Sequence, residues 1–156
     1  MVDDLPRFYI SGMTPADIPA IADIEAECFK DPWSRAAVAL EVAMPEGGGR
    51  VVRRTDTHHI VAYIFFRLIV DEMHILKVAT APPWQRHHGA QQLMSEAIRR
   101  ARKLNMARAF LEVRASNTAA IKLYEKTGFT VAGRRPGYYY DDNDGAIMMI
   151  RPLKEA

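Results

Sequence analysis

The chain has 156 residues, the length of one compact domain, and its 49% hydrophobic and 26% charged residues exclude collagen-like, mucin-like and wholly disordered proteins. Its 21 Lys and Arg residues nearly balance 19 Asp and Glu residues, so a net charge of +2 does not indicate nucleic-acid binding, and any anion site must be local. The single cysteine, Cys28, excludes an internal disulfide and a cysteine-based zinc site. We expect one domain over residues 1–156 in a reducing cytoplasmic setting, without a signal peptide or a membrane-spanning segment.

The first half of the chain predicts two helices among four strands. Thr14 offers an N-cap oxygen, and Asp17 stands three residues later in the spacing of a capping box, so a helix should follow. Pro32 interrupts that helix, and Ser34 can cap a second one that runs to about Met44. Strands are expected over residues 7–11, 50–54, 59–70 and 72–80, the last three as an antiparallel meander after a glycine-containing loop at 45–49.

The second half predicts strands that alternate with helices. Asn117 or Ser116 can cap a helix through Lys126, and Gly128 stands where a left-handed C-terminal residue is wanted. Strands are expected over residues 109–113, 129–134 and 146–150, with a polar loop at 141–145 between the last two. Apolar residues recur at the spacing of one helical face from about Arg86 to Leu104, namely Leu93, Met94, Ala97, Ile98, Ala101 and Leu104.

The junction between a strand and this long helix, at residues 77–90, predicts an anion site. A helix that begins here directs unpaired backbone N–H groups and a positive dipole end at the loop, which is what a phosphate or pyrophosphate requires. Arg86, together with His87 and His88 if they are protonated, adds local positive charge. The alternative at this point is a capped surface helix whose basic residues are merely solvated.

A second segment gives the junction its context. Residues 117–129 read Asn-x-x-Ala-x-x-Leu-Tyr-x-x-x-Gly-Phe, one strand after the loop Gln85-Arg86-His87-His88-Gly89-Ala90. In these two segments the sequence resembles the GCN5-related N-acetyltransferase (GNAT) superfamily. That resemblance implies an α+β fold: a mixed, largely antiparallel central sheet with helices on both faces, splayed where acetyl-CoA binds.

Further motifs bring the sequence closer to the RimI-type ribosomal-protein alanine N-acetyltransferases. They are Phe29-x-x-Pro32-Trp33-Ser34, Asp71-Glu72, Leu111-Glu112-Val113-Arg114-Ala115-Ser116-Asn117 and Tyr138-Tyr139, in that order along the chain. The resemblance implies transfer of acetyl from acetyl-CoA to the N-terminal α-amine of a protein, an alanine-starting small-subunit ribosomal protein. Because one fold serves many acceptors, a small-molecule or lysine amine remains an alternative, as does a non-catalytic acyl-CoA-sensing or ribosome-binding module.

The resemblance also assigns roles to residues. Glu112 would be the general base and Tyr124 the general acid, while Trp33, Tyr138 and Tyr139 would border the peptide groove. A backbone N–H near residues 78–80 would stabilise the oxyanion. The residues that would contact acetyl-CoA are Val78, Ala79, Thr80, Gln85, Arg86, His87, His88, Gly89, Ala90, Asn117 and Tyr124.

The loop before the long helix departs from the superfamily pattern at one position. Without a gap, the loop glycine of the Gln/Arg-x-x-Gly-x-Gly/Ala signature falls on His88, and Ala90 takes the second small position. Sliding the motif by one residue would use Gly89 but would place Gln91 at the small position. We keep the ungapped register, in which His88 must accommodate a β-carbon where glycine would let the backbone approach a phosphate.

Each assigned residue also has an ordinary structural interpretation. Glu112 could simply pair with Arg114 or a lysine, Tyr124 could be a core aromatic, and Asn117 can cap its helix whatever else it does. Cys28 is expected to be a core residue, since no matched Cys–His motif accompanies it. Two further expectations are no metal site at His58, His59 and His74, and a solvated rather than a nucleic-acid-binding face at Arg99, Arg100, Arg102 and Lys103.

Overall fold

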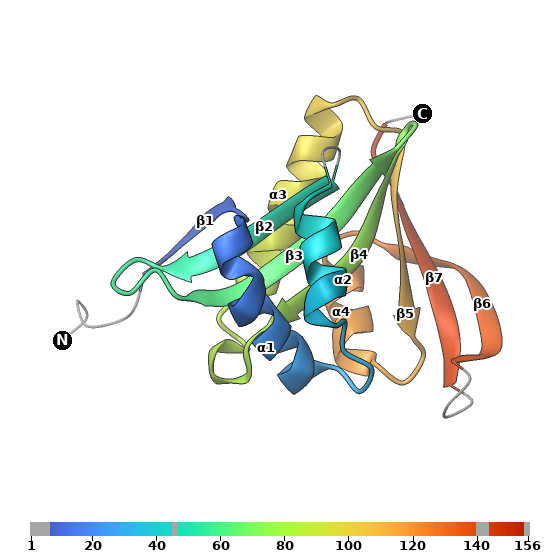
Figure 1. Cartoon of the computed structure of the whole chain (residues 1–156). Coiled ribbons are helices and arrows are strands. Elements are labelled where there is room, and N and C mark those ends of the chain that lie inside the picture. The colour runs from blue at the N-terminus through green and yellow to red at the C-terminus, as the bar shows by residue number, and fades with distance from the viewer. Residues whose placement is uncertain (1–6, 45–46, 140–143, 155–156) are drawn as a thin grey trace. The chain divides into compact units, whose positions relative to one another are not determined.

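Within the part of the chain that the structure describes, seven strands pair into one sheet in the order β1-β2-β3-β4-β5-β7-β6 (Figure 1). The structure is a computed structural model that describes residues 7–44, 47–139 and 144–154, without the side chains of residues 47 and 136–139. The strands are β1 (Phe8–Gly12), β2 (Gly47–Arg54), β3 (Ile60–Ile69), β4 (Glu72–Thr80), β5 (Arg108–Arg114), β6 (Thr130–Tyr139) and β7 (Asp144–Pro152). The helices are α1 (Ile18–Cys28), α2 (Arg35–Val42), α3 (Gly89–Lys103) and α4 (Thr118–Lys126), with short 3-10 turns η2 (Pro15–Asp17) and η3 (Pro82–Trp84).

Strand pairing confirms the mixed, largely antiparallel architecture. β1 runs antiparallel to β2, and β7 runs antiparallel to both β5 and β6. β4 and β5 are parallel, with a register from Glu72 opposite Arg108 to Ile75 opposite Leu111. A parallel pair needs a long crossover connection, which α3 supplies. Both strands continue beyond this four-pair ladder, β4 to Thr80 and β5 to Arg114.

Local signals in the sequence start α2 and α4, and end α4, as expected. The Ser34 side chain accepts a hydrogen bond from the Ala37 N–H at 3.1 Å, and the Asn117 side chain accepts one from the Ala120 N–H at 3.1 Å, so both predicted N-caps are confirmed. Gly128 follows α4 with φ of +93°, the left-handed conformation predicted for it.

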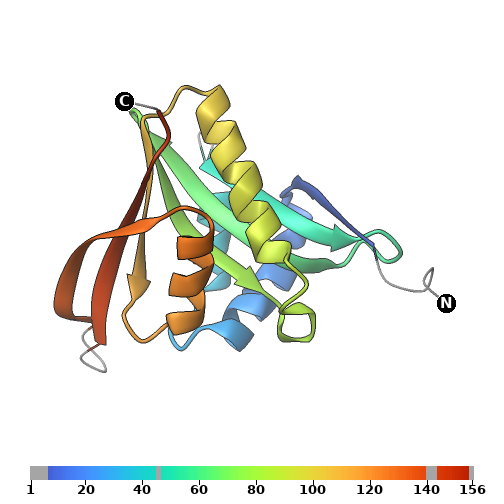
Figure 2. The same ribbon diagram turned by 180° about the vertical axis from the view of Figure 1, so that it is seen from behind.

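The chain divides into two compact units. Unit 1 comprises Met1–Phe66 and Lys77–Leu93, and unit 2 comprises Arg67–Leu76 and Met94–Ala156. In unit 1, α1 and α2 lie on one face of β2 and β3 (Figure 1), and α3 begins on the other face (Figure 2). Every residue of the run 61–66 in β3 is buried, as a strand covered on both faces requires.

The prediction of a loop at residues 45–49 is wrong at its end, because β2 already begins at Gly47. A β-carbon on Gly48 would overlap the buried Phe66 ring, so glycine here lets β2 pass close to β3. Glycine-rich composition is typical of a loop, and it therefore predicted one here. In the structure these glycines belong to a strand, where the missing side chain of Gly48 leaves room for the Phe66 ring.

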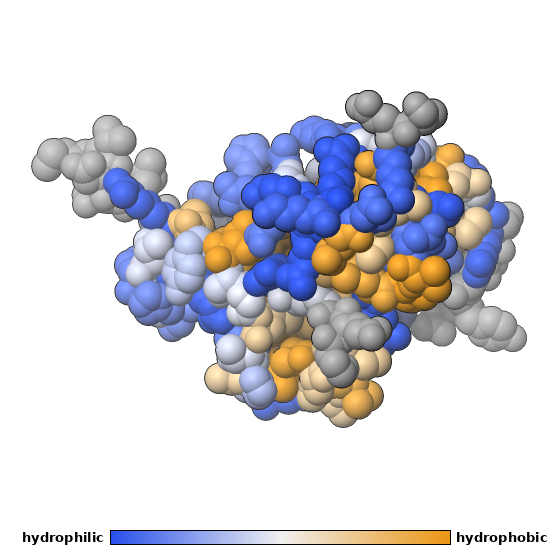
Figure 3. All heavy atoms as spheres, turned by 90° about the horizontal axis from the view of Figure 1, so that it is seen from above, coloured by the Kyte–Doolittle hydropathy of each residue, from blue (hydrophilic) through white to orange (hydrophobic). Residues whose placement is uncertain are grey.

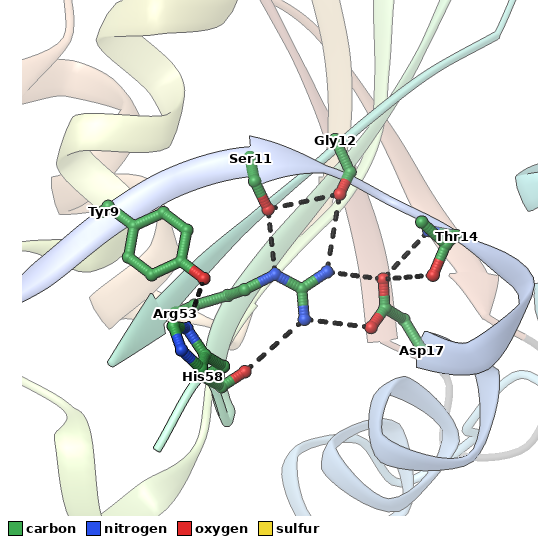
Figure 4. Close-up of polar contacts among 7 residues, drawn as sticks. All are labelled: Tyr9, Ser11, Gly12, Thr14, Asp17, Arg53 and His58. Carbon is green, nitrogen blue, oxygen red and sulfur yellow. Dashed lines mark hydrogen bonds and ion pairs between the residues drawn. The ribbon is translucent and has the colours of Figure 1, made fainter. Parts of the chain in front are cut away.

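An arginine of β2 forms hydrogen bonds to β1 and to the turn η2 (Figure 4). The Arg53 guanidinium of β2 donates two hydrogen bonds to the Asp17 carboxylate, at 3.0 and 2.6 Å, and a third to the Ser11 hydroxyl at 2.8 Å. Asp17 in turn accepts from the Thr14 N–H at 2.9 Å, in the predicted capping position. Burial raises the pKa of Asp17, but the hydrogen bonds from Arg53 and Thr14 more than offset that effect and leave it below its usual value.

The α3 helix separates an apolar face from a charged one. Of the residues predicted to share one helical face, Leu93, Met94, Ala97, Ile98 and Ala101 are buried, while Leu104 lies beyond the end of the helix and is 47% exposed. The basic face is exposed at every expected position, Arg99, Arg100, Arg102 and Lys103. Figure 3 shows how hydrophilic and hydrophobic side chains mix on one face of the molecule. None of the helices in the described part of the chain is long and apolar enough to cross a membrane.

Candidate active site

The end of β4, the loop that follows it and the start of α3 together hold nine of the eleven predicted acetyl-CoA contacts, and all three lie in unit 1. After β4 the chain makes the turn η3, and the Gln85 side-chain amide donates a hydrogen bond back to the Thr80 carbonyl at 3.2 Å. The predicted start of the helix at about Arg86 is wrong. Arg86 and His88 have φ values of +69° and +63°, which delay the helix until Gly89.

The conformation of His88 bears on the register of the loop signature. Its φ of +63° is one that glycine adopts at no steric cost and that a residue with a β-carbon rarely adopts. The backbone therefore has the form that the signature glycine favours, at the position where the ungapped register places that glycine. Gly89, by contrast, is buried, and a β-carbon there would meet Ala62 at an ordinary 3.4 Å.

The first turn of α3 has N–H groups without an acceptor inside the helix. The Gln92 N–H donates to the His88 carbonyl at 2.9 Å as the first helical bond, so the N–H groups of Gly89, Ala90 and Gln91 have no helical acceptor. Three such groups beside the positive end of the helix dipole suit a phosphate or pyrophosphate. The His88 ring nitrogen Nδ1 lies 3.3 Å from the Gln91 side-chain oxygen.

Aromatic side chains surround the start of this loop. The His87 ring packs edge-on against Trp84 and Phe8, with centroid distances of 5.6 and 6.2 Å, and the Arg54 guanidinium lies 4.8 Å from the Trp84 ring centre. A small pocket lies beside this cluster, with Phe8, Trp84 and His87 in its wall. Sequence reasoning missed Phe8 and Arg54, because β1 and β2 bring them here from far away in the chain.

The predicted residues at the end of β4 are half-buried or buried. Ala79 is 7% exposed, and Val78 and Thr80 flank it. The Cys28 thiol donates to the Thr80 carbonyl at 3.3 Å, and burial, aided by Glu27 and Glu25, raises the pKa of Cys28. A thiol held neutral in this way is a poor nucleophile, which fits the expectation that Cys28 is structural.

Unit 2 holds the proposed general base. Glu112 lies on β5 opposite Met148 of β7, with 27% of its side chain exposed. Its carboxylate lies 3.7 Å from the Arg135 guanidinium of β6, and Arg114 instead lies 3.8 Å from Asp144. The sequence analysis did not identify Arg135. Arg135 directly follows the predicted strand 129–134, and it lies near Glu112 because β5 and β6 both pair with β7.

The proposed general acid is also in unit 2. Tyr124 lies in α4, is 7% exposed, and packs edge-on against Phe129. Burial raises the pKa of Tyr124 well above its usual value, so the phenol is protonated at neutral pH and has a proton to give. Asn117 is exposed and caps α4 with its side chain.

The predicted peptide-groove residues come from both ends of the chain. Trp33 follows α1 in unit 1, and its ring lies 5.5 Å from Phe65. Tyr138 and Tyr139 end β6, and their side chains lie outside the described residues.

Comparison with known proteins defines the class to which this fold and these residues belong. The model of the Acetyltransferase (GNAT) family matches residues 18–129, and the chain belongs to that family. The protein is an acetyl-CoA-dependent N-acetyltransferase with the GNAT fold.

Particular relatives lie within this family. The chain is similar to the [Ribosomal protein bS18]-alanine N-acetyltransferase of Escherichia coli (strain K12), with 33% identity over 148 residues that cover 92% of this chain and 97% of that protein. Among solved structures it is similar to the ribosomal-protein-S18-alanine N-acetyltransferase from Escherichia coli, with a TM-score of 0.87, 32% identity and 96% of each chain covered. It is also similar to Ard1 from Thermoplasma volcanium, with a TM-score of 0.85, 28% identity, and coverage of 95% of this chain and 99% of that one.

Proposed function

We propose that this protein, acting as a single acetyltransferase domain, transfers acetyl from acetyl-CoA to the N-terminal α-amine of a protein, an alanine-starting small-subunit ribosomal protein. The observation that carries the proposal is the similarity over 92% of the chain, at 33% identity, to an enzyme named for that acceptor. The motif around Trp33 and the segment 111–117, both typical of the RimI-type enzymes, support the same acceptor class.

Acetyl-CoA binding would use the start of α3. The N–H groups of Gly89, Ala90 and Gln91 lack helical acceptors and can donate to the diphosphate, with Arg86 as a nearby cation. The left-handed backbone at His88 supports this assignment, because it gives the loop the turn that a signature glycine would give. The remaining predicted contacts, Val78, Ala79, Thr80, Gln85, His87 and Asn117, are proposed to line the path of the thioester and its carrier.

The transfer needs one base and one acid. An α-amine has a pKa near ~8 and is mostly protonated at neutral pH, so the Glu112 carboxylate, directly or through water, takes a proton from it. The nitrogen lone pair then attacks the thioester carbon, and a backbone N–H near residues 78–80 stabilises the oxyanion. When the carbon–sulfur bond breaks, the electron pair leaves on sulfur, and the thiolate takes the proton of the Tyr124 hydroxyl. The nitrogen then gives its second proton to water, and water returns a proton to Tyr124, so the product is a neutral amide.

The proposal is tested with peptides that begin Ala-Arg and with the same peptides carrying a blocked α-amine. We expect acetylation only when the α-amine is free, measured as initial rates of CoA release. Equal rates with the two peptides would refute α-amine specificity and would favour a lysine or small-molecule acceptor. Tight acetyl-CoA binding in calorimetry without transfer to any amine would instead favour a non-catalytic sensor.

A further inference from the structure

A carboxylate that the proposed chemistry does not use is fully buried in unit 1. Glu25 lies in α1 and is 0% exposed. Burying a carboxylate costs free energy unless hydrogen-bond donors satisfy its oxygens. The donors that contact Glu25 therefore indicate what it holds in place. Donors from three different segments converge on Glu25.

The first donor is the backbone of the segment that connects α1 to α2. The Trp33 N–H donates to Glu25 Oε2 at 2.9 Å. Residues 29–34 connect the two helices, so this hydrogen bond attaches the connecting segment to the Glu25 side chain of α1. Pro32, immediately before Trp33, has no N–H of its own to contribute.

The other two donors come from the sheet. The Tyr63 hydroxyl of β3 donates to Glu25 Oε1 at 2.5 Å, and the Lys77 ammonium of β4 donates to Oε2 at 3.2 Å. The same ammonium lies 3.7 Å from the Phe29 ring centre and 5.3 Å from the Trp33 ring centre. Lys77 thus joins the carboxylate to both aromatic side chains of the connecting segment.

We propose that Glu25 is a positioning residue for the acceptor: it fixes the connecting segment 29–34, and so the Trp33 side chain, against β3 and β4. The inference rests on the proposed function in one respect, namely that Trp33 borders the acceptor peptide. Glu25 itself is too deeply buried to touch a substrate, so it acts through Trp33 and Lys77. Its loss should weaken acceptor binding and leave acetyl-CoA binding in place.

Steady-state kinetics test this separation of the two substrates. Glu25→Ala should raise the KM for the Ala-Arg peptide by about tenfold, the scale of a lost charge-assisted hydrogen bond, with less than about a twofold change in the KM for acetyl-CoA. Glu25→Gln should restore most of the peptide KM, because its amide oxygen can still accept from the Trp33 N–H. Glu27→Ala, an exposed position on the same helix, is the matched control and should behave as wild type.

Folded Glu25→Ala with an unchanged peptide KM, or with both KM values moving together, would overturn the inference. If Glu25→Ala does not fold, Tyr63→Phe and Lys77→Met replace it, since each removes one donor to Glu25. Each should raise the peptide KM by about threefold. An unchanged peptide KM in both variants would again overturn the inference.

A second measurement does not depend on activity. In a Trp84→Phe background Trp33 is the single tryptophan of the chain, and acrylamide quenching reports how well it is held. Glu25→Ala should increase the quenching and Glu25→Gln should largely reverse the increase; no change would overturn the inference. If wild type fails to acetylate the peptide while quenching responds as expected, the proposed function fails but the anchoring of Trp33 by Glu25 stands.

Discussion

The variant His88→Gly should be more stable than the variant His88→Ala. This is the reverse of the usual case, in which alanine gives the more stable protein. Both variants remove the imidazole, so they differ only in the β-carbon. His88 has φ of +63°, where a β-carbon costs about 1–2 kcal/mol. Glycine loses more backbone entropy on folding, a cost of about 0.5–1 kcal/mol relative to alanine. At the midpoints of these two ranges, His88→Gly is more stable than His88→Ala by about 0.75 kcal/mol.

Urea unfolding measures this difference, and a thermal shift of about 1–4 °C should accompany it for a chain of this size. The control is the same pair of substitutions at His87, which lies outside the left-handed region, so alanine should rank above glycine there. If glycine ranks below alanine at both positions, the backbone at His88 is not strained. The conformation of His88 would then not take the place of a signature glycine.

Three further outcomes follow from other sites. Gly128→Ala should cost about 1–2 kcal/mol in urea unfolding, because φ is +93° and a β-carbon would lie 3.0 Å from the Arg151 side chain; unchanged stability would contradict this. Asp17→Asn should cost about 1.5–3 kcal/mol at neutral pH through its lost hydrogen bonds to Arg53. The Asp17 pKa is lowered on folding, so this wild-type advantage is complete above the unfolded pKa of about 4 and fades as the pH falls below it; a difference independent of pH would refute the ion pair as its source. Glu112→Gln should slow peptide acetylation by about 10²–10⁴-fold near pH 6.5 and by less near pH 9, where the amine loses its proton unaided; a loss equal at all pH values would exclude Glu112 as the base.

The sequence by itself determined the features that depend on neighbouring residues. A cap such as Ser34 accepts a hydrogen bond from an N–H three residues away, and Gly128 ends its helix through its own backbone conformation. Both features can therefore be predicted without knowledge of the fold. Motif spacing likewise indicated the acetyltransferase family, since Asn117 to Phe129 form one helix and its end.

Only the tertiary structure decided which distant residues meet. Glu25 reads as an ordinary helix carboxylate, and its burial appears only when β3 and β4 bring Tyr63 and Lys77 to it. Arg135 of β6 lies near Glu112 of β5 because both strands pair with β7. No local sequence pattern encodes this strand order. From the sequence alone Gly48 was predicted to lie in a loop, but in the structure it is part of β2 and packs against the Phe66 ring. In each case the deciding contact joins segments separated along the chain, and its free energy comes from burial and pairing that exist only once the sheet has formed.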